Sequence, residues 1–406
     1  MNYNEAKAKL EKYGQTQLLR FYDELSEEDK KDLLAQVEST DFSVLEKAAS
    51  EEHNEPNVSP MKTLTLDEIA KEEEEDRNVG LKALKEGKVA MLLLAGGMGT
   101  RLGSENPKGM YNVGLTHELY IFECQMRTLL KRVNECGSYI HLFVMTSPKN
   151  DTKTRAFFKE KNYFGYKGEY VHFFIQDMAP IVGNDGKVLL EGKHTIACSP
   201  NGNGGWFTSL CNAGLYGIIE KEHIEYINVY AVDNVLQQIA DPVFVGATMR
   251  RGCDCGAKVI RKANPDEKVG VICYDHGHPS ITEYYELTDE LRNAKDANGE
   301  YLYNFGVILN YLFKVTELVK IVGASFPLHK AFKKAAYVDE KGELVNPTEP
   351  NAYKYEMLVL DMIKLLNTCL SFEVDRQKEF APIKNLHGVD SVDSARELLK
   401  LNGVEL

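Results

Sequence analysis

Long apolar runs are missing from this sequence of 406 residues. No stretch approaches the ~18 consecutive apolar residues of a membrane-spanning helix. The first residues, MNYNEAKAKLEKYG, contain no apolar segment of the kind that forms a signal peptide. We therefore expect a cytoplasmic protein without a membrane partner.

Basic charge is also scarce, since 48 Lys and Arg residues face 61 Asp and Glu residues and leave a formal net charge of −13. A general nucleic-acid-binding protein presents a basic face, so this balance argues against nucleic acid as a partner. It does not argue against an anionic small molecule. A local group of cations, backbone N–H groups or a bound metal ion can hold phosphate in an acidic protein.

Closely spaced cysteines are the third absence. Of the eight cysteines, only Cys253 and Cys255 lie near each other, and no second pair completes the spacing of a structural zinc site. We therefore expect reduced thiols and a reducing compartment.

What is present is the composition of a folded globular protein, with 43% hydrophobic and 27% charged residues. Leucines at helical spacing predict helices over residues 4–50, and Ser26 to Asp29 fit a capping box that opens the second of them. Residues 51–60 are polar with two prolines and predict a connection. A further helix is predicted over 67–88, and we expect its acidic run at 72–76 to be a solvated face.

From residue 89, short apolar runs alternate with helical patterns. This order is typical of the α/β class, in which helices cover both faces of a parallel sheet; after residue 233 the pattern becomes mixed. The predicted strands are 89–94, 140–145, 170–175, 227–232, 257–261, 269–274 and 280–287, and the predicted helices are 119–133, 149–158, 206–222 and 357–369.

The first of these strands runs into a glycine-rich loop. Gly96, Gly97, Gly99 and Gly103 fall within eight residues, and the loop also carries Arg101, Pro107 and Lys108. Glycines let backbone N–H groups approach phosphate oxygens, Arg adds a fork of donors and Lys a point charge. The glycine spacing differs from G-x-G-x-x-G by one residue, and no Walker motif is present. A glycine-rich turn without a ligand is the alternative to a triphosphate-binding loop.

The segment Leu93–Leu115, LLAGGMGTRLGSENPKGMYNVGL, closely resembles the eukaryotic UDP-N-acetylhexosamine pyrophosphorylases, which are relatives of the UDP-glucose pyrophosphorylases. The resemblance extends from Gln17 to Asn385. It implies a Rossmann-like, mixed and mainly parallel sheet of the nucleotide-diphospho-sugar transferase type. It also suggests an N-terminal helical segment at 1–58, a nucleotidyltransferase catalytic domain at 59–370 and a short C-terminal lobe at 371–406.

The resemblance also implies residue roles. Uracil would be contacted by Gln176, which follows a strand, and by Gly202 of the second glycine-rich loop, Ser199–Gly205; Asp233 would bind Mg²⁺, with Mn²⁺ as the alternative ion. The implied catalytic cations are Arg101, Lys108 and Lys384, the last in Phe380-Ala-Pro-Ile-Lys-Asn385. The remaining implied nucleotide contacts are Leu94, Ala95, Gly96 and Gly97, and the implied sugar contacts are Asn203, Gly270 and Glu283.

One segment departs from the family pattern. Relatives carry F-N-A-G-N-I-A-N where this chain has Tyr303 to Asn310, so Val307 stands at a position where we expect an asparagine. Two alternatives follow: a hydrogen bond to the sugar is lost, or Asn304 or Asn310 substitutes as the sugar contact, and the preference among sugars is left open.

The implied reaction joins UTP and N-acetylglucosamine 1-phosphate to give UDP-N-acetylglucosamine and pyrophosphate. The attacking phosphate is already anionic, so no general base is needed, and cations with Mg²⁺ suffice for positioning and charge stabilisation. The alternatives are an enzyme that uses glucose or N-acetylgalactosamine 1-phosphate, a non-catalytic nucleotide-sugar sensor, and an NAD-dependent dehydrogenase. We expect a monomer or weak homodimer.

Overall fold

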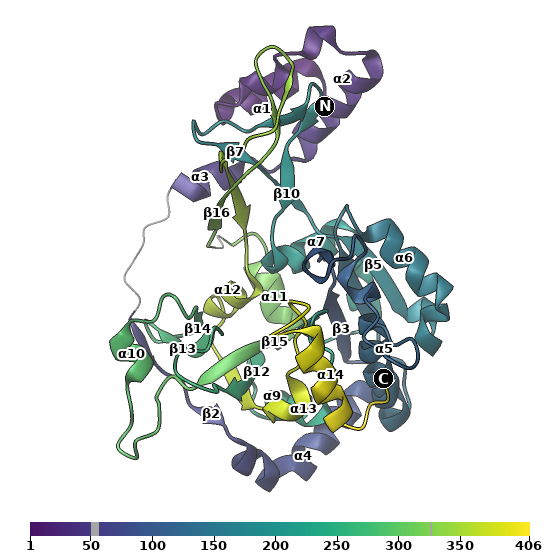
Figure 1. Ribbon diagram of the computed structural model, residues 1–406, viewed down its shortest axis with the longest axis vertical. Coiled ribbons are helices and arrows are strands. Elements are labelled where there is room, and N and C mark those ends of the chain that lie inside the picture. The colour runs from purple at the N-terminus through teal and green to yellow at the C-terminus, as the bar shows by residue number, and fades with distance from the viewer. Residues whose placement is uncertain (50–56, 325–326) are drawn as a thin grey trace. The chain divides into compact units, whose positions relative to one another are not determined.

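The computed structural model describes residues 1–49, 57–324 and 327–406 (Figure 1). The chain forms two compact units from non-consecutive stretches. The first unit contains Met1–Glu55, Gln176–Gly205 and Ala324–Val359, and the second contains Pro56–Ile175, Trp206–Gly323 and Leu360–Leu406. This grouping differs from the consecutive boundaries predicted after residues 58 and 370.

The first unit joins N-terminal helices to short strands from later in the chain. Half of the predicted capping box is present: Ser26 Oγ accepts a hydrogen bond from the Asp29 N–H at 3.2 Å, but the Asp29 carboxylate accepts from Ser26 Oγ instead of the Ser26 backbone N–H. The helices are α1 (Tyr3–Lys12), α2 (Glu27–Ser39) and α3 (Ser43–Ala49). The strands are β6 (Met178–Pro180), β7 (Val182–Gly183), β8 (Leu190–Gly192), β9 (Thr195–Ile196), β10 (Cys198–Pro200), β16 (His329–Lys333), β17 (Tyr337–Val338), β18 (Leu344–Val345) and β19 (Ala352–Glu356).

One hydrophobic core explains why these distant stretches come together. Leu10, Leu33 and Phe42 are buried in the same cluster as Val188 and Tyr355. Burial of such side chains stabilises by about 25 cal/mol per Å² of apolar surface. The N-terminal helices therefore depend on residues more than a hundred positions away, which sequence spacing could not indicate.

The second unit is built on a mixed, mainly parallel sheet with the order β2-β20-β12-β15-β11-β3-β4-β5. Strand β3 is parallel to β11 and β4, whereas β15 is antiparallel to both of its main neighbours, β11 and β12. The predicted α/β class with a Rossmann-like, mainly parallel sheet is confirmed. The strands are β2 (Thr63–Leu64), β20 (Cys369–Glu373), β12 (Cys255–Arg261), β15 (Phe305–Lys314), β11 (Tyr226–Ala231), β3 (Val89–Leu94), β4 (Leu142–Thr146) and β5 (Val171–Ile175), with β13 (Val271–Asp275), β14 (His278–Thr282) and β1 (Val58–Pro60) attached through β13.

Several helices of this unit differ from their predicted extent. The stretch predicted as one helix over 206–222 is divided into α7 and α8, and the apolar stretch 357–369 is helical only in α12, because its last residue begins β20. The strand predicted over 280–287 ends at Thr282. The helices are α4 (Leu66–Lys85), α5 (Ile121–Cys136), α6 (Asp151–Glu160), α7 (Trp206–Asn212), α8 (Tyr216–Lys221), α9 (Pro242–Arg250), α10 (Asp289–Asn293), α11 (Val315–Ile321), α12 (Val359–Lys364), α13 (Arg376–Glu379) and α14 (Val392–Leu401).

The predicted connection at 51–60 is only partly described by the structure. The connection predicted at 51–60 lies outside the described residues up to residue 56, and its last residues form β1. Within the described ranges, no helix combines the length and the apolar character that a membrane crossing needs. After β20 the chain returns to the core of the second unit, where Phe380, Ile383 and Leu399 are buried.

The acidic run at 72–76 is not simply a solvated face, and that prediction is wrong for Asp76. The Asp76 side chain is fully buried and accepts a hydrogen bond from Arg250 at 2.7 Å, while Arg251 bonds Glu72 at 2.8 Å. The burial follows from close packing of α4 on α9, since a Cβ on Gly246 would overlap the carbonyl oxygen of Asp76.

The close approach of α4 and α9 predicts a stability effect. We expect Gly246→Ala to lower the free energy of unfolding by about 1–3 kcal/mol, because the added methyl group has no space. Urea unfolding followed by circular dichroism measures this. The matched control is Gly217→Ala in α8, where a Cβ meets nothing within 4 Å; equal stability of the two variants would contradict the packing argument.

Candidate functional site

The glycine loop leaves β3 at its carboxyl end and is held by side chains that follow β4. Asn150, which is fully buried, donates through Nδ2 to the carbonyl oxygens of Ala95 at 2.9 Å and Gly97 at 3.3 Å. Ser147 Oγ donates to the carbonyl oxygen of Gly96 at 2.9 Å. The carbonyl groups of the loop are thus occupied by the neighbouring strand's loop.

The N–H groups of the same loop are not occupied. In the described part of the chain, the backbone N–H groups of Gly96, Gly97 and Met98 donate to no protein acceptor. Successive free N–H groups of this kind form an anion-binding concavity. The alternative interpretation was a glycine-rich turn that binds no ligand. That interpretation does not explain why the carbonyl groups of the loop accept hydrogen bonds while its N–H groups have no protein acceptor.

The glycine loop then folds back on itself, so that Arg101 and Lys108 both lie close to the end of β3. The N–H of Gly99 donates to the carbonyl oxygen of Asn106 at 2.8 Å, and the N–H of Lys108 donates to that of Gly97 at 3.1 Å. Arg101 lies in the exposed turn between these bonds and makes no ion pair with any described residue. Its guanidinium group is therefore available to an anion.

Asp233 and Lys384 reach the same edge of the sheet. Strand β11 is parallel to β3 with Ala231 opposite Leu94, so the loop containing Asp233 leaves the sheet beside the glycine loop. The N–H of Ile383 donates to the carbonyl oxygen of Asp233 at 2.9 Å. This bond places Lys384, the next residue, at the Asp233 loop.

The charges of these residues act on one another at Lys108, which is partly buried. Burial lowers the pKa of the Lys108 ammonium group below its ordinary value; the carboxylate of Asp233 opposes this, and the cations Arg101 and Lys384 add to the lowering. The structure therefore brings together the three predicted catalytic cations and the predicted metal ligand. Lys108 has no ion-pair partner among the described residues, as expected of a cation that awaits an anionic ligand.

Lys384 is held by a neighbouring carboxylate. Its Nζ lies 2.9 Å from Asp390 Oδ2, and its backbone N–H donates to the carbonyl oxygen of Asp390 at 2.7 Å. Asp390 has φ of 51°, a left-handed conformation that costs energy for a residue other than glycine. The loop after Lys384 thus stores strain while it fixes the lysine.

Two of the predicted sugar-binding residues of the second unit, Gly270 and Glu283, lie close together. A Cβ on Gly270 would lie 3.6 Å from Val307 and 3.9 Å from Glu283, so these three residues share one surface. Asn304 is half-buried. Asn310 is completely buried and accepts a hydrogen bond from Asn228 at 2.7 Å, so it offers no surface to a sugar.

The predicted uracil-binding residues belong to the first unit. Gln176 is almost fully buried directly after β5. Gly202 has φ of 90°, and a Cβ there would overlap the carbonyl oxygen of Met357, so only glycine fits. Asn203 accepts a hydrogen bond from the Val359 N–H at 2.9 Å through its side-chain oxygen, which leaves its amide nitrogen for a ligand.

Sequence reasoning missed the residues that hold this site in place. Ser147 and Asn150 carried a weak signal, because both lie close to the junction of the predicted strand 140–145 and the predicted helix 149–158. Asn234 bonds the segment before Lys384 and was visible only as the neighbour of Asp233. Asp390 carried none, because an irregular loop separates it from Lys384.

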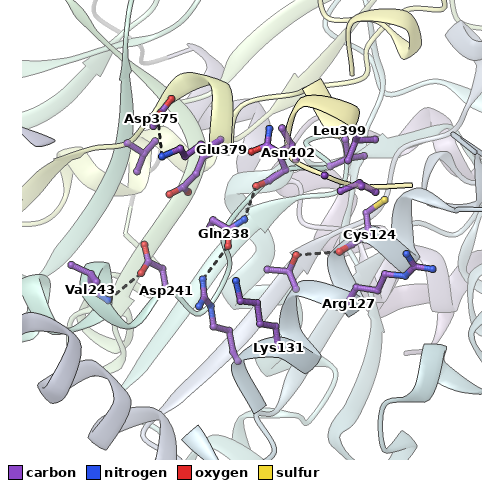
Figure 2. Close-up of a pocket in the computed structure, with 18 of the residues that line it drawn as sticks. Cys124, Arg127, Lys131, Gln238, Asp241, Val243, Asp375, Glu379, Leu399 and Asn402 are labelled. Atoms are coloured by element: carbon purple, nitrogen blue, oxygen red, sulfur yellow. Dashed lines mark hydrogen bonds and ion pairs between the residues drawn. The ribbon is translucent and has the colours of Figure 1, made fainter. Parts of the chain in front are cut away.

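A separate cavity of about 1050 Å³ lies between α4, α5 and the C-terminal residues (Figure 2). It is lined by Gln238, Asp241 and Glu379 among others, and by none of the four charged residues described above. The cavity is therefore distinct from the glycine-loop site.

Comparisons with known proteins agree with the geometry. The family model described as UTP–glucose-1-phosphate uridylyltransferase matches residues 36–402. The human protein named UDP-N-acetylhexosamine pyrophosphorylase-like protein 1 is 36% identical across 97% of this chain and 83% of its own length. The UDP-N-acetylglucosamine pyrophosphorylase of Saccharomyces cerevisiae is 34% identical across 92% of this chain and 84% of its own length. The crystal structure of the uridine diphosphate N-acetylglucosamine pyrophosphorylase from Trypanosoma brucei in complex with inhibitor has a TM-score of 0.82 at 28% identity, and covers 98% of this chain and 84% of that one. The resemblance seen in the glycine loop is confirmed.

The lowered pKa of Lys108 predicts that this residue costs stability. Its charged form is disfavoured in the folded state, so the cost is fully present below the folded pKa and is lost as the pH rises from the folded pKa to the higher unfolded pKa. We expect Lys108→Met to melt at the same or a higher temperature than the parent chain at pH 7, with the difference shrinking toward pH 10. Lys131→Met, at an exposed position of α5, is the control. A Lys108→Met variant that melts far below the parent at pH 7 would contradict the argument.

Proposed function

Because the chain belongs to the UTP–glucose-1-phosphate uridylyltransferase family, we propose that it transfers the uridylyl group of UTP to N-acetyl-α-D-glucosamine 1-phosphate. The products are UDP-N-acetylglucosamine and pyrophosphate. The names of the relatives support the amino sugar as acceptor. The observation that carries the proposal is Lys108, a partly buried cation without a protein partner, placed among Arg101, Asp233 and Lys384 beside the free N–H groups of the glycine loop.

The reaction needs positioning and charge stabilisation more than proton transfer. A phosphate oxygen of the sugar phosphate forms a bond to the α-phosphorus of UTP while the bond from that phosphorus to the bridging oxygen of pyrophosphate breaks. The attacking oxygen is already anionic at neutral pH, so no proton has to be removed. Arg101 and Lys108 would bind the departing pyrophosphate, and Lys384 the incoming phosphate.

Asp233 is the proposed ligand of Mg²⁺, with Mn²⁺ as the alternative. Its carboxylate makes no hydrogen bond or ion pair with any described residue, so its oxygens are free to coordinate. Magnesium commonly combines one or two carboxylates with substrate phosphates. In keeping with this, the described residues contain no group of three or more His, Cys, Asp or Glu side chains that could form a metal site alone. When bound, the ion would neutralise charge on the phosphate oxygens.

The nucleoside and the sugar would be read by the remaining predicted residues. We propose that Gln176 and Gly202 contact uracil and that Asn203 contacts the sugar. Leu94, Ala95, Gly96 and Gly97 would hold the nucleotide through the loop backbone. Gly270, Glu283 and Asn304 would face the N-acetylhexosamine, and Asn310 is not carried into the proposal because it is fully buried.

The alternative functions are not equally supported by the site and the family assignment. Val307 replaces an amide with an apolar side chain on the surface shared by Gly270 and Glu283, so glucose or N-acetylgalactosamine 1-phosphate stays the second candidate for the acceptor. A non-catalytic sensor is disfavoured because the cations and Asp233 are all in place. The family assignment leaves no role for an NAD-dependent dehydrogenase.

The setting of the enzyme is also part of the proposal. We propose a cytoplasmic monomer or weak homodimer. The cytoplasmic assignment is supported by the thiols of the chain, all eight of which are free cysteines.

The acceptor is tested by kcat/KM for pyrophosphate release from UTP with a panel of sugar 1-phosphates, since specificity is a ratio of those values. We expect N-acetylglucosamine 1-phosphate to give the highest value. A higher value with glucose or N-acetylgalactosamine 1-phosphate would replace the acceptor but keep the chemistry. No pyrophosphate release with any member would favour the sensor.

The role of Lys108 is tested by the same Lys108→Met variant. Loss of one cation that stabilises transition-state charge is expected to reduce kcat by about 10²–10³-fold, with the fold intact by circular dichroism. Lys131→Met is again the control and should retain turnover. Near-parental turnover of Lys108→Met would remove this residue from the catalytic site.

The metal site is tested with Asp233→Asn, which keeps size and hydrogen-bonding capacity but removes the charge. We expect the Mg²⁺ concentration for half-maximal activity to rise by at least tenfold. Binding of Mn²⁺ in the presence of UTP, followed by electron paramagnetic resonance, should weaken in parallel. Asp32→Asn, at an exposed position of α2, is the matched carboxylate control and should change neither readout; unchanged Mn²⁺ binding in Asp233→Asn would remove Asp233 as the ligand.

A further inference from the structure

A lysine with no exposed surface lies beneath the catalytic edge of the second unit. Lys258 on β12 donates through Nζ to Glu379 Oε2 at 2.7 Å, to Asp241 Oδ2 at 2.8 Å and to the carbonyl oxygen of Gln238 at 3.0 Å. All three positions of its ammonium group are used. Its acceptors come from two segments, the loop that follows β11 and the short helix α13.

Lys258 and its carboxylate partners stabilise each other's charges against the effect of burial. Burial alone would lower the pKa of Lys258, but the carboxylates of Asp241 and Glu379 outweigh it and raise that pKa above its ordinary value. Burial also opposes the charge of Asp241, yet Lys258 holds the pKa of Asp241 below its usual range. Lys258 is therefore charged whenever the protein is folded at neutral pH.

Glu379 is also held through its backbone, by Asn234 of the loop that contains Asp233. While its carboxylate binds Lys258, the backbone carbonyl oxygen of Glu379 accepts a hydrogen bond from Asn234 Nδ2 at 2.7 Å. The Asn234 side-chain oxygen accepts from the N–H of Ala381 at 2.9 Å. Asp233 precedes Asn234 directly, and its carbonyl oxygen accepts from the N–H of Ile383 at 2.9 Å. One short ladder thus runs from the buried cation to both functional residues.

We infer that Lys258 is a positioning residue, which fixes the loop of Asp233 against the segment of Lys384. In the proposed function, on which this inference rests, Asp233 holds the metal ion and Lys384 the attacking phosphate. The separation of these two residues then sets the line of attack on the α-phosphorus. A misplacement of about 1 Å in such an arrangement can cost about 100-fold in rate.

Apolar packing also holds this segment, since Phe380, Ala381 and Ile383 are buried in the core of the second unit, but apolar contacts are not directional. Figure 2 shows Gln238, Asp241 and Glu379 around the cavity of about 1050 Å³, so the three acceptors of Lys258 border open space on one side. Buried ion pairs are commonly no more stabilising than apolar residues of the same volume. The ammonium group of Lys258 instead fixes the distance and orientation between two segments, because it bonds Gln238 and Asp241 of one and Glu379 of the other.

The inference is tested by two substitutions of similar size at one position. Glu379→Gln keeps an oxygen acceptor for Lys258, whereas Glu379→Met removes it; both leave the Lys258–Asp241 ion pair, so both are expected to fold. We expect Glu379→Met to lower kcat by about 10–100-fold, with KM for UTP within about twofold of the parent. Glu379→Gln should stay within about threefold of the parent in kcat.

A second readout does not depend on activity. Hydrogen exchange at the amides of Ala381 and Ile383 should be faster in Glu379→Met than in Glu379→Gln, because these amides form the ladder. The control for a purely structural loss is Asp76→Asn, which disturbs a buried carboxylate on α4 and should change neither kcat nor exchange at these amides.

The outcomes separate this inference from the proposed function. Equal kcat and equal exchange in the Gln and Met variants would overturn the positioning role. A parent chain that releases no pyrophosphate would overturn the proposed function, and the exchange measurement would still decide whether Lys258 orders the segment of Lys384.

Discussion

The parallel pairing of β3 with β11 is the constraint on which the site depends. It sets Leu94 opposite Ala231, so the glycine loop and the loop of Asp233 leave the sheet at the same edge. Carboxyl ends of adjacent parallel strands are where ligands bind in α/β sheets. Everything else at the site refines this placement: Ser147 and Asn150 turn the loop's N–H groups away from the protein, and Asn234 draws in the segment of Lys384.

Stability and chemistry oppose each other at Lys108. A cation that is partly buried without an ion-pair partner lowers the stability of the empty protein, and its desolvation strengthens its interaction with an anion. The adjacent cations Arg101 and Lys384 increase both effects. In the proposed function a phosphate ligand would offset this cost, and its binding should stabilise the protein by an amount that grows with the logarithm of its concentration relative to Kd.

Much of the fold and of the site's cations could be predicted because the signals are local. A buried parallel strand reads as a continuous apolar run, as at 89–94, and glycines with Arg101 and Lys108 indicate phosphate binding within a single segment. Strand β15 was not predicted although its sequence is largely apolar, and its antiparallel direction carries no local signal because apolar residues suit either direction. The burial of Asp76, Lys258 and Asn310 was also beyond local patterns, because each depends on a partner that the chain reaches only after a long detour.

The first unit has a consequence for how the chain folds as it is made. Its N-terminal helices share a core with Val188 and with Tyr355, so residues synthesised first find their last partners only when most of the chain has left the ribosome. Contacts between such distant residues slow folding. Until then part of the apolar surface of α1 and α2 stays uncovered, so a late truncation would destabilise a segment far from the break.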